Sequence, residues 1–107
     1  RTTAQYTGPL SVVDADLADH AEAVVREAVS NAVRHADATT LSISVVVADE
    51  LTIEVIDNGR GFSDDVARSG LNNLRKRALD MGGTFSVESR PEQGTVLRWS
   101  APCLGTD

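Results

Sequence analysis

The stretch Asp57-Asn58-Gly59-Arg60-Gly61 follows directly on the alternating apolar run Leu51-Thr-Ile-Glu-Val-Ile56, and the chain is best understood from this junction. The apolar run predicts a strand that ends at Asp57. A carboxylate at a strand end, followed by two glycines that let the backbone turn sharply and approach a flat ligand closely, is one way to receive a nucleobase. The alternative is a plain turn, since Asp-Asn-Gly is common turn chemistry.

The size and charge of the chain limit its possible functions. A length of 107 residues falls in the single-domain range, and aromatic residues make up only 4% of the chain, so the core must be built from Val, Ile, Leu and Ala. The formal net charge of -6 argues against a nucleic-acid or anionic-membrane surface, because a basic stripe is missing from the sequence. We expect one domain, residues 1–107, with no nucleic-acid or membrane contact.

The chain carries one cysteine, Cys103, which excludes a disulfide framework or a thiolate metal cluster and suits a reducing cytosol. No apolar run in the sequence is long enough to span a bilayer, and the start Arg1-Thr-Thr lacks the apolar core of a signal peptide. The sequence does not begin with Met, which suggests a fragment of a longer protein. A cytoplasmic location is therefore expected.

A long helix is expected from Leu17 to Ala36, where small and apolar residues recur at helical spacing after a candidate N-cap, Asp16. Turning this helix by about 100° per residue gathers four polar side chains beside the apolar stripe, within an arc of about 100°: Glu27, Asn31, Arg34 and His35. Each alone is an ordinary surface or helix-end residue. Together, ahead of a strand pair and an Asp-x-Gly-x-Gly turn, they favour the rim of a site.

The remaining pattern predicts one short entry strand and two hairpins. The entry strand is Leu10 to Val13, after a polar, unpatterned start. The hairpins are Thr40 to Val47 with Leu51 to Ile56, and Thr84 to Ser89 with Thr95 to Ala101. In the last strand Trp99 is expected in the core because it alternates with Leu97. The hydroxyl of Thr95, at a strand start beside the Asp57 strand end, could complete a hydrogen-bond frame for a base edge.

A second helix is expected from Leu71 to Met81, opened by Ser69-Gly70 and ended by Gly82-Gly83, after a short loop from Phe62 to Arg68. Free N–H groups at its start, with a glycine at the entrance, could hold a phosphate chain, and the helix dipole would add about 0.3–1 kcal/mol. The alternative is a glycine that only turns a loop into a helix.

The order of these elements and their polar residues resembles the ATP-binding catalytic domain of sensor histidine kinases, in the superfamily shared with gyrase, heat-shock chaperones and mismatch-repair ATPases. The segment from Glu27 to Ala36 looks like the family's N box, and Asp57 to Gly61 looks like its first glycine box. Ser69 to Ala78 is similar to the second glycine box and Gly94-Thr95 to the last, so the resemblance covers nearly the whole chain.

Finer features point to one branch of that family. The form Gly-Leu-x-Asn-Leu-Arg-x-Arg-Ala from Gly70 to Ala78, with a very short lid before it, is similar to the NarL-like branch. The runs Val24 to Ala36 and Leu97 to Pro102 resemble the mycobacterial oxygen- and redox-sensing kinases of the dormancy response.

The resemblance implies an α+β fold of the Bergerat type, a two-layer α/β sandwich in which a mixed sheet carries helices on one face. It implies a domain that binds Mg-ATP and donates the γ-phosphoryl group to a histidine on an upstream dimerisation domain. A response-regulator aspartate would be the later acceptor, the full-length kinase would be a homodimer, and any haem would lie in an upstream sensor domain. The alternatives are an anti-sigma-factor-type serine kinase of the same superfamily and a non-catalytic interaction domain.

The resemblance also implies roles for single residues. Asp57 would accept a hydrogen bond from the adenine amino group, and Thr95 would help frame the base through water. Asn31 would coordinate Mg²⁺, an oxygen-loving cation, and Glu27 would hold its water shell, which makes these two the catalytic pair. The other nucleotide contacts implied are Arg34 with a phosphate, His35 with the ribose or phosphate side, the glycine-box residues Gly59, Gly61 and Ser69, and Gly70, Leu71 and the next amides with the β and γ phosphates.

Two departures from the family pattern are visible. The second box has Ser69-Gly70 where many kinases have two spaced glycines, which affects the lid's grip on phosphate. Nothing in the chain matches the phosphoacceptor-histidine motif, since His20 and His35 both fall in the long helix. The substrate histidine is therefore expected upstream of this domain.

Overall fold

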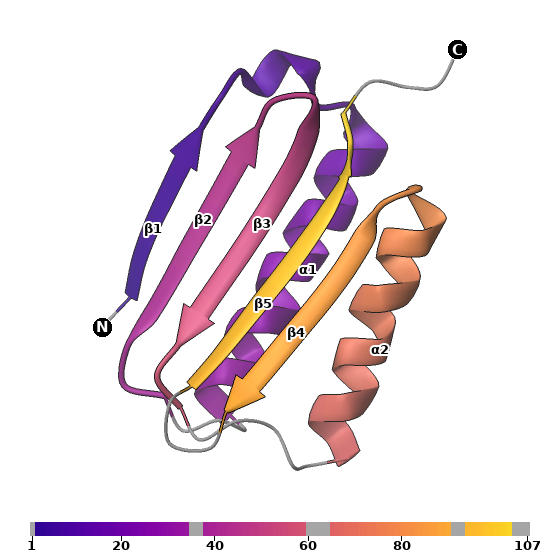
Figure 1. Cartoon of the computed structure of the whole chain (residues 1–107). Coiled ribbons are helices and arrows are strands. Elements are labelled where there is room, and N and C mark those ends of the chain that lie inside the picture. The colour runs from indigo at the N-terminus through magenta and orange to yellow at the C-terminus, as the bar shows by residue number, and fades with distance from the viewer. Residues whose placement is uncertain (1, 35–37, 60–64, 91–93, 104–107) are drawn as a thin grey trace.

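The protein has two layers, a five-stranded sheet and two helices that both cover one face of it (Figure 1). The computed structural model describes residues 2–34, 38–59, 65–90 and 94–103. Its elements in chain order are β1 (Thr2–Thr7), a short 3₁₀ helix (Leu10–Val12), α1 (Ala15–Arg34), β2 (Leu41–Val47), β3 (Glu50–Asp57), α2 (Asp65–Asp80), β4 (Thr84–Arg90) and β5 (Gly94–Pro102). The expected α+β sandwich with helices on one face is confirmed.

The sheet is mixed, and its strand order is β1-β2-β3-β5-β4. β1 runs parallel to β2, which needs a crossover connection, and α1 supplies it. The other neighbours are antiparallel, so both expected hairpins are present. Insertion of β5 between β3 and β4 brings the start of β5 beside the end of β3.

The expected entry strand from Leu10 to Val13 is wrong. Leu10–Val12 forms a 3₁₀ helix, and the strand is Thr2–Thr7. All six residues of β1 are exposed, and Ala4 and Tyr6 are its only apolar residues, so its sequence gives a weak strand signal. Val12 and Val13 instead pack against the core.

The long helix is confirmed, but its cap is Asp14 and not Asp16. The Asp14 carboxylate accepts a hydrogen bond from the Leu17 amide at 2.8 Å, the contact that an N-cap side chain makes. Asp16 lies in the first turn, where a negative charge also suits the helix dipole. The buried positions of α1, which include Leu17, Val24 and Ala28, face the sheet.

α2 begins at Asp65, earlier than the expected start at Leu71. Ser69 and Gly70 therefore lie inside the helix and not at its entrance. Part of the expected loop, Phe62 to Asp64, lies outside the described residues. A helix tolerates an interior glycine at a cost of about 1 kcal/mol, and packing of Leu74 and Ala78 against the core offsets that cost.

The expected glycine stop of α2 is confirmed. Gly82 has φ 72°, its amide donates to the Leu79 carbonyl at 3.1 Å, and the Gly83 amide donates to the Ala78 carbonyl at 2.7 Å. This pair of hydrogen bonds is the Schellman motif, in which a left-handed residue ends the helix.

Trp99 is the largest fully buried side chain, with 0% exposure. Its indole N–H donates to the Leu74 carbonyl at 3.1 Å, which ties β5 to α2. Ile53 and Phe85 lie opposite it on the neighbouring strands. The expected core position is confirmed. Over the residues that the structure describes, neither helix has the length and hydropathy that spanning a bilayer requires.

Candidate functional site

Asp57 and Thr95 form a buried polar pair at one end of the sheet. Asp57 is the last residue of β3, and Thr95 lies directly opposite it on β5. Asp57 is 5% exposed and Thr95 is 2% exposed. The expectation that Thr95 lies beside the Asp57 strand end is confirmed.

The turn after β3 fixes the Asp57 carboxylate. The Gly59 amide donates to Asp57 Oδ1 at 2.8 Å, and Gly59 is itself buried. Burial raises the pKa of the Asp57 carboxyl above its ordinary 3.8, while the Gly59 hydrogen bond acts in the opposite direction. A buried carboxylate of this kind is stabilised by a further hydrogen-bond donor, which a ligand can supply.

Gly94 is required where β5 starts. Its φ is 98°, and a Cβ built on it would lie 1.9 Å from the Asp57 carbonyl oxygen. Movement of a side chain cannot relieve this clash, because the atom that the Cβ would meet belongs to the backbone. Glycine therefore lets the start of β5 lie close to the Asp57 backbone. Thr95, the next residue, then pairs with Asp57 in the sheet.

On α1, Asn31 and Glu27 lie one helical turn apart. Asn31 is 2% exposed, and its Nδ2 has no hydrogen-bond partner within residues 2–34, 38–59, 65–90 and 94–103. A buried amide left unpaired costs about 1–3 kcal/mol, so buried polar groups of this kind normally meet a ligand or water. Asn31 is therefore a candidate ligand contact.

The Glu27 carboxylate packs against Gly70 of α2. A Cβ built on Gly70 would lie 2.6 Å from Glu27 Oε2, so any side chain at this position would displace the carboxylate. Gly70 is buried, whereas its neighbour Ser69 is exposed and Leu71 is half-buried. The second glycine box thus meets the N box through Glu27 and Gly70.

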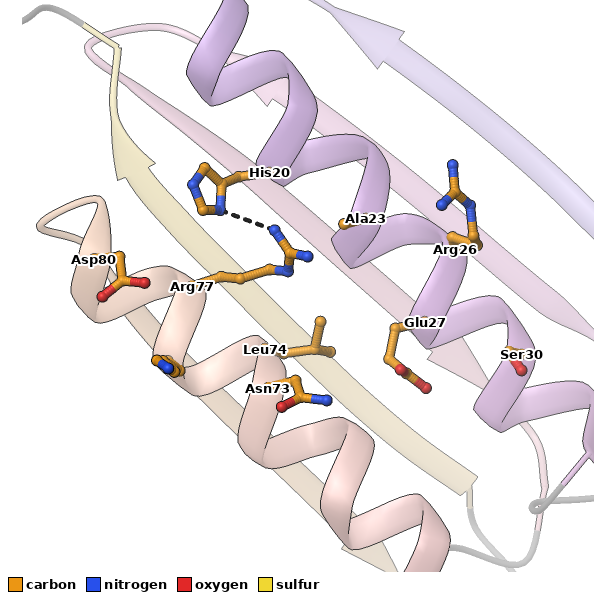
Figure 2. A pocket seen from close by; sticks show the side chains of 10 residues that line it. His20, Ala23, Arg26, Glu27, Ser30, Asn73, Leu74, Arg77 and Asp80 are labelled. Carbon is orange, nitrogen blue, oxygen red and sulfur yellow. Dashed lines mark hydrogen bonds between the residues drawn. The ribbon is translucent and has the colours of Figure 1, made fainter.

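Glu27 also lines a groove of about 530 Å³ between α1 and α2. Figure 2 shows its side chain extending from α1 into the space between the helices, with Asn73 and Leu74 on the facing helix. Further along the groove, Arg77 Nη1 and His20 Nδ1 are hydrogen-bonded at 3.2 Å (Figure 2). Because arginine only donates, His20 Nδ1 is the acceptor there.

Arg34, His35 and Gly61 are the remaining predicted site residues. Arg34 is exposed at the last residue of α1. His35 and Gly61 lie outside the described residues. The structure therefore brings the predicted residues together as two pairs, Asp57 with Thr95 and Glu27 with Gly70, and adds the unpaired amide of Asn31.

The hydrogen bonds of the Asn58 side chain, which lies between Asp57 and Gly59, were missed by the sequence reasoning. This side chain bonds to Thr39 and Thr40, which precede β2. The available signal was the position of an asparagine in a glycine turn, because asparagine side chains readily bond to nearby backbone amides.

The residues present fit a divalent cation that takes most of its ligands from elsewhere. Among the described residues there is no cluster of three or more His, Cys, Asp or Glu side chains that could hold a metal. Glu27 and Asn31 offer oxygen donors from successive turns of one helix. Mg²⁺ usually keeps several waters and binds one or two protein oxygens together with substrate phosphates.

Comparisons with known proteins identify relatives of this chain. The chain is 41% identical over 88 residues to the sensor protein VraS of Staphylococcus saprophyticus, a match that covers 78% of this chain and 25% of that protein. VraS of Staphylococcus aureus is 38% identical over the same length, with the same shares covered. The chain thus spans about a quarter of the length of these curated relatives.

Solved structures give the same result. The ATP binding domain of PrrB from Mycobacterium tuberculosis is 28% identical, with a TM-score of 0.62 over 85% of this chain and 71% of that one. Full-length ShkA in complex with AMPPNP has a TM-score of 0.72 over 94% of this chain and 25% of that one, at 20% identity, which supports the fold. Residues 16–104 match the family model described as histidine kinase-, DNA gyrase B-, and HSP90-like ATPase, and the chain therefore belongs to that family of ATPase domains.

Proposed function

We propose that this chain is the ATP-binding catalytic domain of a sensor histidine kinase, which binds Mg-ATP and donates the γ-phosphoryl group to a histidine of its own parent kinase. The observation that carries the proposal is the buried Asp57 carboxylate, held by the Gly59 amide beside the buried Thr95. A buried acceptor with a neighbouring hydroxyl suits the amino edge of adenine. Asp57 accepts from the adenine amino group, and Thr95 frames the base through water.

The phosphate side of the site follows from α1 and α2. Asn31 coordinates Mg²⁺ through its side-chain oxygen, and Glu27 holds the water shell of the ion. The buried Nδ2 of Asn31, which lacks a partner among the described residues, is a donor that a phosphate oxygen can satisfy. The other contacts belong to Arg34, His35, Gly59, Gly61, Ser69, Gly70 and Leu71. Because the chemistry of phosphoryl transfer depends mainly on positioning and charge neutralisation, these residues act by holding the triphosphate and its metal.

The relatives support a role in two-component signalling, since VraS is a sensor protein. The parent kinase supplies the dimerisation domain with the phosphoacceptor histidine, acts as a homodimer, and passes the phosphoryl group to a response regulator. This domain is cytoplasmic. Its closer kinship is with the NarL-like branch and with the mycobacterial oxygen and redox sensors DevS and DosT of the dormancy response. The motif from Gly70 to Ala78 and the run from Leu97 to Pro102 support that kinship.

A titration with a fluorescent ATP analogue, with and without Mg²⁺, tests the proposal. We expect saturable binding that ATP displaces more strongly than ITP, which carries an oxygen in place of the adenine amino group. Folding of the sample is checked by circular dichroism. Absence of binding by the folded chain, or equal displacement by ATP and ITP, would contradict adenine recognition.

Phosphoryl transfer is tested with the full-length parent kinase and radiolabelled ATP. The label should appear as acid-labile, base-stable phosphohistidine. An acid-stable phosphoserine would instead indicate a serine kinase of the anti-sigma-factor type. Nucleotide binding without any transfer would indicate a non-catalytic domain.

A further inference from the structure

The side chain of Asn58 joins two segments that are distant in the sequence. Its Oδ1 accepts hydrogen bonds from the amides of Thr39 and Thr40, both at 2.9 Å. Its Nδ2 donates to the Thr39 hydroxyl, also at 2.9 Å. The backbone amide of Asn58 donates to the Thr40 carbonyl at 3.3 Å. Asn58 thus connects the segment before β2 to the turn after β3 through hydrogen bonds.

The turn held in this way is the one that orients Asp57. Asn58 lies between Asp57 and Gly59, and the Gly59 amide is the donor to the Asp57 carboxylate. A rotation of the backbone at Asn58 would therefore move both the carboxylate and its donor. Leu41, which directly follows Thr40, lies opposite Asp57 in the sheet, so the same bonds also fix the neighbouring strand.

The other side of this connection reaches α1. The Ala38 amide donates to the Ala32 carbonyl at 3.2 Å, and Ala32 follows Asn31 in the helix. Thr39 and Thr40 come directly after Ala38. Hydrogen bonds therefore lead from the helical turn that carries Asn31 to the turn that carries Asp57.

We propose that Asn58 is a positioning residue that holds the Asp57 turn in register with the Asn31 end of α1. The inference rests on the proposed ATP site. Asparagine suits this role because the arrangement needs an acceptor for two amides and a donor for one hydroxyl on the same short side chain. Aspartate keeps the acceptors and loses the donor, and alanine loses both.

The consequence is measurable as base selectivity. If Asn58 orients the Asp57 carboxylate, replacement of Asn58 weakens recognition of the adenine amino group more than it weakens contacts with the triphosphate. The ratio of the Kd for ITP to the Kd for ATP then falls. A residue that only stabilises the fold would lower the unfolding midpoint and leave this ratio unchanged. The ratio also cancels any charge effect that acts equally on both nucleotides.

The experiment measures Kd for ATP and ITP, and the thermal midpoint, in the unsubstituted chain and in Asn58→Ala, Asn58→Asp and Thr39→Val. We expect Asn58→Ala to lower the selectivity ratio about tenfold, which corresponds to about 1.4 kcal/mol. Asn58→Asp should retain most of the ratio, because the Thr39 hydroxyl can donate to the new carboxylate. Thr39→Val should lower the ratio by about threefold, because it removes the hydrogen bond between the Asn58 side chain and the Thr39 hydroxyl.

The matched control is Thr84→Val. The Thr84 hydroxyl bonds to the Ser100 hydroxyl at 2.9 Å, at the end of the sheet away from Asp57. This variant loses the same kind of hydrogen bond as Thr39→Val. It should lower the thermal midpoint and leave the selectivity ratio unchanged.

An unchanged ratio in both Asn58→Ala and Thr39→Val, measured on folded protein that selects ATP, would overturn the positioning role and leave the proposed function intact. If Asn58→Ala does not fold, Thr39→Val alone decides the matter. If the unsubstituted chain binds neither nucleotide, or binds both equally, the proposed adenine site fails and this inference fails with it.

Discussion

The carboxylate of Glu27 occupies the space that a side chain at Gly70 would need, since a Cβ there would lie 2.6 Å from Oε2 and 2.7 Å from Cδ. These two residues come from α1 and α2, and both helices lie on the same face of the sheet (Figure 1). Absence of a side chain at Gly70 is therefore what lets the two predicted phosphate-side boxes meet.

Gly70→Ala should lower the affinity for Mg-ATP without lowering the stability of the fold. Alanine is the better helix former by about 1 kcal/mol, and the Glu27 carboxylate is the flexible end of a side chain that can move aside. We expect the free energy of unfolding to stay equal or to rise by up to about 1 kcal/mol, while affinity for Mg-ATP falls. Denaturant unfolding and nucleotide titration measure the two effects.

The control for this variant is Gly82→Ala. Gly82 has φ 72° and no atom within 4 Å of a built Cβ, so alanine there meets backbone strain of about 1–2 kcal/mol and no clash. It should lower stability and leave Mg-ATP affinity unchanged. Full Mg-ATP affinity in Gly70→Ala would show that the position of the Glu27 carboxylate does not matter for binding.

Asp57→Asn should weaken ATP binding by about one to two orders of magnitude, because hydrogen bonds to charged groups contribute about 1.5–3 kcal/mol. An asparagine can turn its NH₂ group toward the adenine amino group. Both groups are then donors, and no hydrogen bond forms between them. Competition titration with ATP checks the change, and circular dichroism checks the fold. An affinity equal to that of the unsubstituted chain would remove Asp57 from base recognition.

The same substitution should change the pH dependence of stability. Burial raises the pKa of Asp57, so its contribution to stability is fully present below its ordinary 3.8 and is lost as pH rises through the raised value. Without nucleotide, Asp57→Asn should therefore gain stability over the unsubstituted chain near about pH 7 and lose that advantage as pH falls toward about 4. Urea unfolding at several pH values measures the difference.

The control for the pH series is Asp19→Asn, at an exposed position of α1. Surface substitutions of this kind usually change stability by less than about 0.5 kcal/mol. A constant difference between Asp57→Asn and the unsubstituted chain across the whole pH range would contradict the raised pKa.

Asn31→Ala should reduce Mg-dependent binding of ATP much more than binding of adenosine, which has no phosphate. The Asn31 amide is buried and its Nδ2 lacks a partner within the described residues, so its removal relieves a cost of about 1–3 kcal/mol that partly offsets the lost packing. The fold should survive. Isothermal titration with ATP, with and without Mg²⁺, and with adenosine measures the effect, and equal losses for both ligands would argue against a metal role.

Trp99→Phe should destabilise the fold by about 1–3 kcal/mol, from loss of packing and of the bond to the Leu74 carbonyl. Denaturant unfolding followed by far-UV circular dichroism measures this cost. Nucleotide selectivity should not change, because Trp99 contacts α2 through the core. A change in the ratio of ITP to ATP affinity would indicate that the core and the base site are coupled.

Several elements could be predicted from the sequence because their residues repeat with the period of the structure they form. The buried stripe of α1, the alternation around Ile53 and the core position of Trp99 are signals of this kind. The end of α2 at Gly82 was also predictable, since a left-handed residue after a helix favours glycine. In each case the information lies within a few neighbouring residues.

Other features depend on contacts that no local pattern encodes. β1 is exposed along its whole length and is a strand because its backbone pairs with β2, so its apolar signal is weak. The start of α2 was misplaced because a glycine inside a helix and a glycine at its entrance look the same in the sequence. Packing on the sheet decided between the two.

The sequence by itself determined which residues are chemically suited to a nucleotide site, because carboxylate, amide and glycine stand at recognisable spacings from Glu27 to Thr95. Only the tertiary structure decided how they meet: Thr95 opposite Asp57, Glu27 against Gly70, and Asn58 bonded to Thr39. The physical reason is that the spacing of apolar residues in the sequence indicates which face of each helix or strand is buried, one element at a time. Contacts between elements depend on strand order and on which helix faces which, and these are set when the whole core packs.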